Sequence, residues 1–322
     1  MVTGAISEGS TPSKRTKQHG GYVERIKKLF KEFSSCECLK SGNSGDEKFV
    51  VEEQGNKYFV KFTKYYINPN LKEIMEKANV PHVKIIDVGA VDGYNYIIQE
   101  YFKSESLKDR LSILSKEEIR KIAKTLGKGY SELIKFFPNK QTTDEEYLKF
   151  IQFYNLLMGT YEEASKNLNK FAAENLEQLK QVKLYLETNI EKLKQCPLVF
   201  GHPDIHPGNF LFKENELVAI DYDTTNYAIL AVSILWGILS DNILDMEKYL
   251  SFTSGYLQGL FDNNIEEGVI TGINLIFAFI TLRFVFKLLR KNEVDKAEQY
   301  IINTSKYFTN GKFDLKNRLT QT

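Results

Sequence analysis

The stretch GHPDIHPGNFLF, residues 201–212, places a carboxylate and an amide between two short apolar runs. Two prolines flank Asp204 and restrict the backbone around it, so this residue is expected in a turn. Asn209 follows five residues later, immediately before the apolar run 210–212. A carboxylate held in such a turn can accept the proton of a hydroxyl group, which is general base chemistry.

A second acidic pair follows in VAIDYD, where Asp221 and Asp223 come after a short apolar run and the turn KENE. The two apolar runs predict a hairpin of short strands with Asn209 at one end and Asp221 at the other. This layout brings an amide oxygen and a carboxylate together, and both are hard oxygen ligands suited to Mg²⁺. Asp204 is not needed as a ligand and is left for proton transfer.

A small sheet precedes this segment. Residues 49–62, FVVEEQGNKYFVKF, contain two β-like runs around the turn 54–57, which predicts a hairpin. A short helix over 70–79 follows, and then strands over 82–89 and 94–102, separated by an Asp-Gly turn. The pattern predicts a sheet that carries one helix.

The remainder is predicted to be mainly helical. From Lys116 the apolar residues follow a helical period, with long charged stretches such as 161–195. Two apolar runs, 224–240 and 268–282, are each shorter than an unbroken span of about 20 residues and contain polar residues, so we expect buried core helices and no membrane span.

The composition is that of a soluble globular protein. The chain has 322 residues, of which 42% are hydrophobic and 26% charged, and its formal net charge is +1. A balanced charge of this kind argues against a nucleic-acid partner. Residues 1–21 lack the apolar core of a signal peptide, so we expect a disordered leader or tail there.

The cysteines bear on the compartment. Cys36, Cys38 and Cys196 are an odd number in a long chain, which favours a reducing, cytoplasmic location over a disulfide framework. Cys36 and Cys38 alone are too few for a structural zinc site.

The segments HPDIHPGN and IDYD resemble the catalytic and metal segments of the aminoglycoside phosphotransferase and choline kinase group of small-molecule kinases. The order H-x-D-x-x-x-x-N and then D is also that of the protein-kinase catalytic loop and metal aspartate. The resemblance implies an α+β, protein-kinase-like fold with two lobes. The implied parts are a leader (1–21), a nucleotide-binding lobe with a small antiparallel sheet (22–102) and a helical catalytic and substrate-binding lobe (103–322).

The resemblance also implies roles for the acidic residues. Asp204 would be the catalytic carboxylate, Asn209 and Asp221 would hold Mg²⁺, and Asp223 would be an accessory acid near the metal. The reaction would move the γ-phosphoryl group of ATP or GTP to a hydroxyl group of a small molecule.

The implied nucleotide contacts lie in the first lobe. Lys61 in YFVKF matches the strand lysine that grips the α- and β-phosphates, with Glu73 as its helix partner and Glu76 as a second choice. Further contacts would come from a phosphate-covering loop and a hinge: Ser41, Gly42 and Ser44 in SGNSGD, and Glu100 and Phe102 in IIQEYF.

The substrate side is predicted from charge. Between residues 224 and 268 there are six acids, Asp241 and Asp245 among them, and the only base is Lys248. An acidic lobe suits a cationic acceptor such as an aminoglycoside, with choline or another small metabolite as the alternative. The other interpretation of these acids is that they lie on solvated helix faces and bind no substrate.

The chain is expected to act as a monomer or homodimer. Two other classes of function remain open. One is a nucleotide-binding pseudokinase, against which the complete set of Lys61, Asp204, Asn209 and Asp221 argues. The other is a metal-dependent phosphoesterase that uses His202 and His206 in HPDIH. Because the chain has only four histidines, such a metal centre lacks ligands.

Overall fold

The chain forms an α+β protein with two compact units. In the computed structural model the described residues are 15–39, 46–202, 204–205, 207–214, 216–222, 225–234, 246–309, 311–316 and 319. One unit comprises residues 1–72 and 84–103, and the other comprises 73–83 and 104–322. The change of unit after Lys103 falls one residue from the predicted boundary, but the inclusion of 73–83 in the second unit was not anticipated.

The first unit is built on an antiparallel sheet with the strand order β1-β2-β3-β5-β4. The predicted hairpin is present, because Gln54 and Gly55 both have positive φ and form the tight turn between two of the strands. Asp92 and Gly93 form the second such turn. The first strand was not predicted. The strands are β1 (Phe33–Leu39), β2 (Glu47–Glu53), β3 (Asn56–Thr63), β4 (Ile85–Val91) and β5 (Tyr94–Glu100).

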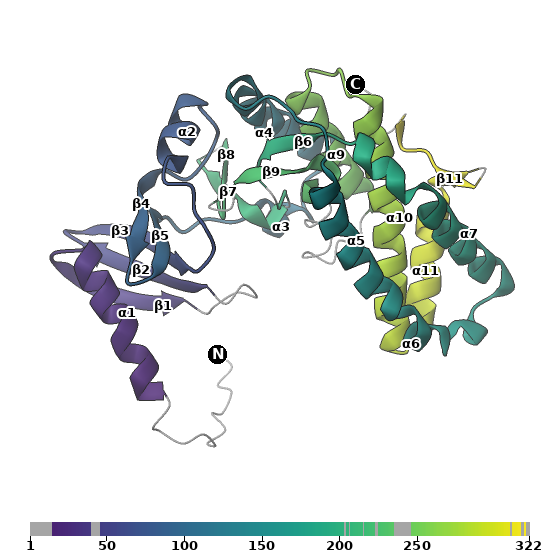
Figure 1. The fold of residues 1–322 in the computed structure, drawn as a ribbon, viewed down its shortest axis with the longest axis horizontal. Coiled ribbons are helices and arrows are strands. Elements are labelled where there is room, and N and C mark those ends of the chain that lie inside the picture. The colour runs from purple at the N-terminus through teal and green to yellow at the C-terminus, as the bar shows by residue number, and fades with distance from the viewer. Residues whose placement is uncertain are drawn as a thin grey trace. The chain divides into compact units, whose positions relative to one another are not determined.

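Helix α1 (Arg15–Leu29) lies along one face of this sheet (Figure 1). Ile26 of the helix and Phe30, which directly follows it, are buried against Phe49, Val60 and other apolar side chains of the strands. The helix begins inside the stretch 1–21 that was predicted to be disordered, and residues 1–14 lie outside the described residues. The apolar contacts in its second half anchor the helix to the sheet.

The second unit is mainly helical, as predicted. Its long helices α10 and α11 lie side by side (Figure 1). Short helix α2 (Leu71–Lys77) begins in the first unit and ends in the second. The remaining helices are α3 (Leu107–Arg110), α4 (Lys116–Phe136), α5 (Asp144–Gly159), α6 (Tyr161–Ser165), α7 (Ala173–Asn189), α9 (Met246–Leu260), α10 (Glu267–Arg290) and α11 (Val294–Ser305). The strands are β6 (Leu198–Gly201), β7 (Phe210–Lys213), β8 (Glu216–Ala219), β9 (Asn226–Ile229), β10 (Phe308–Thr309) and β11 (Lys312–Phe313).

The two apolar runs have different outcomes. Among the described residues, α10 is the one helix long and apolar enough to cross a membrane, and 83% of its most apolar window is buried inside the protein, as in a core helix. The run 224–240 is not a single helix. Residues 226–229 form β9, which pairs with the buried strand β6 and satisfies its backbone groups, and helix begins at Leu230.

Helices α4 and α9 approach each other so closely that only glycine fits at several positions. A Cβ atom added to Gly255 would lie 2.1 Å from the carbonyl oxygen of Arg120, and one added to Gly259 would lie 2.1 Å from that of Lys124. The obstacles are backbone atoms, so they cannot move aside as a side chain would. This crossing therefore joins the two helices through direct backbone contact.

We predict that Gly255→Ala lowers the free energy of unfolding by about 1–3 kcal/mol, because the added methyl group must push the two helices apart. The matched control is Gly159→Ala at the end of α5, where a Cβ atom would meet nothing within 4 Å. The control should leave stability unchanged or raise it by up to about 1 kcal/mol through helix propensity. Urea denaturation measures both, and equal stability of the two variants would contradict the close crossing.

Candidate active site

The catalytic segment begins where buried strand β6 ends. His202, which follows Gly201, is 2% exposed. Its Nε2–H group donates a hydrogen bond to the carbonyl oxygen of Ile220 (2.8 Å), and its Nδ1 atom accepts one from the backbone N–H of Asp204 (3.1 Å). These two partners assign one neutral tautomer to the ring. His202 therefore orients the backbone of Asp204, as a loop-positioning residue would.

Four hydrogen bonds close a ring through this segment. Besides the two bonds of His202, the side-chain Nδ2 of Asn209 donates to the carbonyl oxygen of Asp204 (3.0 Å), and the backbone N–H of Ile220 donates to the carbonyl oxygen of Asn209 (2.9 Å). Asp204 is thus held through its N–H group and its carbonyl group. The ring fixes the catalytic candidate and the metal candidate relative to each other.

The predicted hairpin is confirmed, and it carries Asn209 and Asp221 at its two ends. Strands β7 and β8 pair from Phe210 opposite Ala219 to Lys213 opposite Glu216. Asn209 ends a 3-10 turn directly before β7. Asp221 has a φ of +58°, a left-handed conformation that aspartate tolerates better than most residues.

The chemistry of these two side chains fits a hard cation. Because Nδ2 of Asn209 donates to Asp204, the remaining polar atom of this amide is the oxygen Oδ1. The carboxylate of Asp221 comes from the other end of the same hairpin. An amide oxygen and a carboxylate are the ligand types that Mg²⁺ prefers.

Tyr222 anchors the chain directly after Asp221. This side chain is fully buried, and its hydroxyl group donates a hydrogen bond to the carbonyl oxygen of Val83. His82 packs edge-on against the Tyr222 ring at 5.5 Å, and residues 81–83 pair with Ala219 of β8. The segment before β4 therefore forms a parallel β-bridge at the edge of the hairpin, in keeping with the place of 73–83 in the helical unit.

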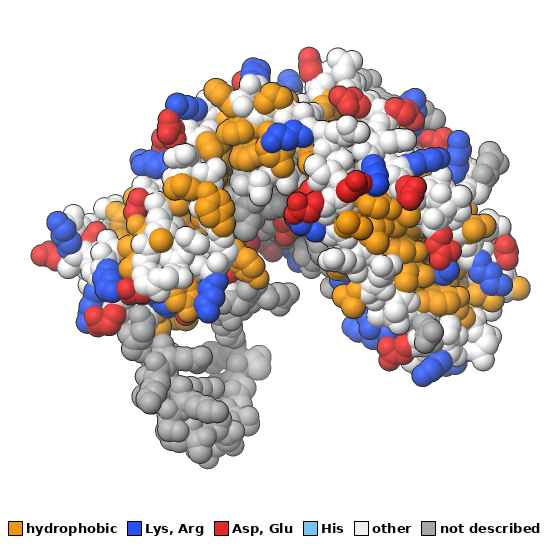
Figure 2. All heavy atoms as spheres, viewed as in Figure 1, with side chains coloured by type: hydrophobic (Ala, Val, Ile, Leu, Met, Phe, Trp, Pro, Cys, Tyr) orange, Lys and Arg blue, Asp and Glu red, His pale blue; other side chains and the backbone are white. Residues whose placement is uncertain are grey.

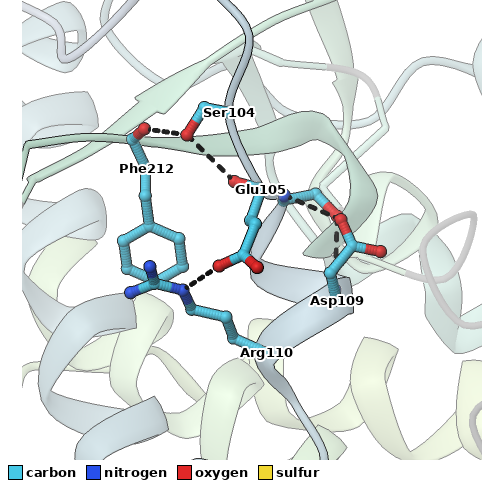
Figure 3. Close-up of polar contacts among 6 residues, drawn as sticks. Ser104, Glu105, Asp109, Arg110 and Phe212 are labelled. Atoms are coloured by element: carbon cyan, nitrogen blue, oxygen red, sulfur yellow. Dashed lines mark hydrogen bonds and ion pairs between the residues drawn. The ribbon is translucent and has the colours of Figure 1, made fainter.

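The other edge of the hairpin is covered by residues 104–106, which enter the helical unit before α3 (Figure 3). The backbone N–H of Phe212 donates to the carbonyl oxygen of Glu105 (3.0 Å), and the hydroxyl group of Ser104 donates to the carbonyl oxygen of Phe212. Arg110 lies over the Phe212 ring at 4.3 Å and donates to the carboxylate of Glu105 (2.7 Å). Ser106 and Asp109 complete the cluster as a capping box at the start of α3.

In the sheet unit, Lys61 lies on β3 on the face opposite α1. Its ammonium group is 3.2 Å from the carboxylate of Asp46, and both side chains are at most 5% exposed. The resemblance suggested Glu73 as the partner, and the structure differs. Leu71 and Met75 form the buried side of α2, so Glu73 lies on the exposed side, where it pairs with Lys77 at 2.6 Å.

The predicted hinge continues from β5. The backbone N–H of Glu100 donates to the carbonyl oxygen of Lys84 (2.9 Å), and that of Tyr101 donates to the carbonyl oxygen of Lys57 (3.1 Å). These bonds attach the hinge to the neighbouring segments of the chain. Its contacts with a nucleotide, including that of Phe102, stay a prediction.

Several predicted site residues cannot be placed. Those that lie outside the described residues are Ser41, Gly42, Ser44, His206, Asp223, Asp241 and Asp245. The described acids of the stretch 224–268 are locally paired in part, since Glu247 contacts Lys306 at 2.9 Å and Lys116 at 3.7 Å, and Glu267, at its end, contacts Lys316 at 3.1 Å. These pairs are typical of helix surfaces, so the described part of the stretch does not support an acidic substrate face.

Sequence reasoning missed Asp46, although a signal was present. The two-residue turn at 54–55 sets the register of the hairpin, which places Lys48 opposite Lys61. Side chains alternate along a strand, so Asp46, two residues before Lys48, shares the face of Lys61. Tyr222 and the segment 81–83 carried no comparable signal, because their contacts join positions more than a hundred residues apart.

A known family model matches the middle of the chain. Residues 94–236, which include β5 and the whole catalytic segment, match the family model for choline/ethanolamine kinase. A search of curated protein sequences finds no match to the chain.

Two solved structures share the fold. One is a spectinomycin phosphotransferase in complex with ADP and spectinomycin, with 13% identity, a TM-score of 0.56, and coverage of 90% of this chain and 95% of that one. The other is a thermostable variant of an aminoglycoside phosphotransferase in complex with ADP and hygromycin B, with 13% identity, a TM-score of 0.50, and coverage of 88% and 96%. Over residues 94–236 the chain is therefore similar to choline/ethanolamine kinases, and it has the fold of the two phosphotransferase structures.

We predict an acid-sensitive contribution of His82 to stability. Burial is the largest influence and lowers the pKa of His82 below its ordinary 6.5, although the Val80 carbonyl group and Glu76 act in the opposite direction. The unfolded chain therefore takes up the proton more readily, and the stability due to neutral His82 is present above about pH 6.5 and lost as the pH falls from there. Urea denaturation at pH 7.5 and 5.5 should show a smaller difference for His82→Gln than for the wild type. An equal difference would contradict the burial of a neutral ring.

We also predict that Lys61→Met lowers the free energy of unfolding by about 3–5 kcal/mol, because the buried Asp46 carboxylate loses its ammonium partner. The double variant Lys61→Met/Asp46→Asn removes both charges and should recover most of this loss. Equilibrium denaturation of the two variants and of Asp46→Asn alone completes the cycle. Additive effects of the two single substitutions would show that the pair is not coupled.

Proposed function

We propose that this chain transfers the γ-phosphoryl group of ATP or GTP to a hydroxyl group of a small molecule, with Asp204 as the catalytic carboxylate. The observation that carries the proposal is the closed ring of hydrogen bonds through His202, Asp204, Asn209 and Ile220. Phosphoryl transfer asks little covalent chemistry of the protein and depends on positioning and charge stabilisation. A carboxylate whose backbone is held at both its N–H and carbonyl groups meets the first requirement.

In the proposed reaction the acceptor hydroxyl group lies within hydrogen-bond reach of the Asp204 carboxylate. Its oxygen forms a bond to the γ-phosphorus while the bond from that phosphorus to the β–γ bridging oxygen breaks. The proton of the hydroxyl group passes to Asp204, and the nucleoside diphosphate leaves with the bridging oxygen. Asp204 thus orients the acceptor before transfer and accepts its proton during transfer.

Asn209 Oδ1 and the Asp221 carboxylate are the groups that would hold Mg²⁺, with Asp223 as an accessory acid. When bound, the ion would neutralise charge on the phosphate oxygens of the donor. Support comes from the amide nitrogen of Asn209, which is committed to Asp204 and so leaves an oxygen for the cation. The left-handed backbone at Asp221 is a further sign, since strained conformations are often retained where function needs them.

For the donor, we propose that Lys61 binds the nucleotide phosphates, that the loop containing Ser41, Gly42 and Ser44 covers them, and that the backbone from Glu100 to Phe102 contacts the base. The ADP complexes of the two related structures support a nucleotide donor. Because Lys61 contacts Asp46 in the sheet unit, phosphate oxygens would compete with this carboxylate for the ammonium group.

For the acceptor, we propose a hydroxylated amine. An aminoglycoside-type antibiotic is the first candidate, since the related structures contain spectinomycin and hygromycin B. Choline or ethanolamine is the second, and the family match over residues 94–236 favours it. Both classes combine a hydroxyl group with a cationic nitrogen, which Asp241 and Asp245 would attract.

We predict that Asp204→Asn lowers the rate of transfer by about 100-fold or more while Mg²⁺-nucleotide affinity stays near that of the wild type, because the carboxylate acts mainly in the transition state. The assay couples ADP or GDP release to acceptor turnover. Aminoglycosides are screened first and choline and ethanolamine next, each with ATP and GTP in parallel. Calorimetry measures nucleotide affinity separately.

Asp295→Asn on the exposed surface of α11 is the matched control and should transfer normally. Asp221→Ala should lose the Mg²⁺-dependent part of nucleotide binding, which distinguishes a metal ligand from a proton acceptor. Near-wild-type transfer by Asp204→Asn would refute the assignment of the catalytic carboxylate. Nucleotide binding without turnover of any acceptor would favour the pseudokinase alternative.

A further inference from the structure

The helical unit contains a pocket that shares no residue with the segment 201–223. It has a volume of about 690 Å³ and lies between α5, α6 and the last two turns of α10. Its apolar lining is formed by Phe153, Leu156, Leu157 and Phe284. The Leu156 side chain is 70% exposed, so apolar surface continues from the pocket to the outside. Figure 2 shows hydrophobic side chains gathered over α5 on this face of the helical unit.

Positive charge surrounds this apolar lining. Four cations contribute to the pocket, and they are Arg283, Lys287, Arg290 and Lys291. Their spacing of four, seven and eight residues places them along one side of the helix. Among the described residues that line the pocket, the only carboxylate is that of Glu163. The pocket is therefore apolar inside with a net positive rim.

The helix dipole explains only part of this arrangement. Basic residues are favoured in the last turn of a helix, which accounts for Arg290 and Lys291. Arg283 lies two turns earlier and half-buried, with its guanidinium group over the Phe153 ring at 5.0 Å. Burial, and next the charge of Arg290, lower the pKa of Arg283.

No ion pair neutralises Arg283, Arg290 or Lys291 among the side chains that the structure describes. Like charges along one side of a helix repel each other, and a partly desolvated guanidinium group adds to that cost. An anion in the pocket would offset both costs.

We propose that this pocket binds a compact organic anion with an apolar, preferably aromatic, body. The volume is within the usual range for small-molecule sites, and the guanidinium groups can donate paired hydrogen bonds to a carboxylate, sulfonate or phosphate head. A cationic acceptor would be repelled here. The site is therefore not the acceptor subsite of the proposed reaction, and the inference stands independently of that function.

The test uses 8-anilino-1-naphthalenesulfonate as the anionic probe and N-phenyl-1-naphthylamine as its neutral counterpart. Each probe is titrated with the whole chain, and its fluorescence reports binding. The wild type should bind the sulfonate more tightly than the neutral amine, and binding should weaken with salt. Arg283→Gln/Arg290→Gln should raise the dissociation constant of the sulfonate about tenfold or more, since charge-assisted hydrogen bonds are lost.

The matched control is Lys121→Gln/Lys124→Gln, which removes two cations from the basic pocket between α4 and α9 and should leave sulfonate binding unchanged. If the first double variant melts at a lower temperature, Arg290→Gln/Lys291→Gln replaces it, because both side chains are exposed. Unchanged sulfonate binding in these variants, equal affinity for the neutral amine, or displacement of the probe by Mg²⁺-ATP would each overturn the proposal.

Discussion

The backbone of Ile220 is the point on which the catalytic segment depends. Its N–H group bonds to Asn209 and its carbonyl group to His202, so this one residue, directly after β8, connects the end of the hairpin to the loop before it. Without these two bonds, Asp204 and Asp221 would sit at opposite ends of a 17-residue excursion with no fixed relation to each other. Because the groups involved are largely buried, leaving any of them unsatisfied would cost about 1–3 kcal/mol.

The hairpin that carries this ring is too short to be stable alone. Strands β7 and β8 have four residues each, and an isolated two-stranded hairpin is marginal in water. Residues 81–83 pair with the outer edge of β8 and residues 104–106 with the outer edge of β7. Both flanking segments lie where the chain changes from one compact unit to the other. The same passages that connect the units therefore flank the hairpin that carries Asn209 and Asp221 at its ends.

Two kinds of rigidity support this arrangement. In the helical unit, α10 is buried on nearly all sides and α4 and α9 touch through their backbones, so these helices have little freedom to shift. In the sheet unit, the rigid feature is a charge pair. The Lys61 ammonium group is held by Asp46 on a buried face of the sheet, which restricts the position of this long side chain.

What the sequence by itself determined was local. The tight turns at 54–55 and 92–93, the amphipathic helices and the hairpin between Asn209 and Asp221 follow from the residues because turn chemistry and hydrophobic period act over a few positions. The spacing of His202, Asp204, Asn209 and Asp221 likewise indicated the class of chemistry. Asp46 was within reach of the same reasoning, since strand register alone places it beside Lys61.

Only the tertiary structure decided the remainder. Glu73 faces outward because the buried side of α2 is selected by packing, and the run 226–229 is a strand because β6 needed a partner for its backbone groups. The addition of 81–83 to β8 and the anchoring of Tyr222 on Val83 join residues 139 positions apart. The positive pocket at the end of α10 takes most of its apolar lining from α5, more than a hundred residues earlier. Such contacts depend on which surfaces meet after the helices assemble, and no local pattern in the chain specifies them.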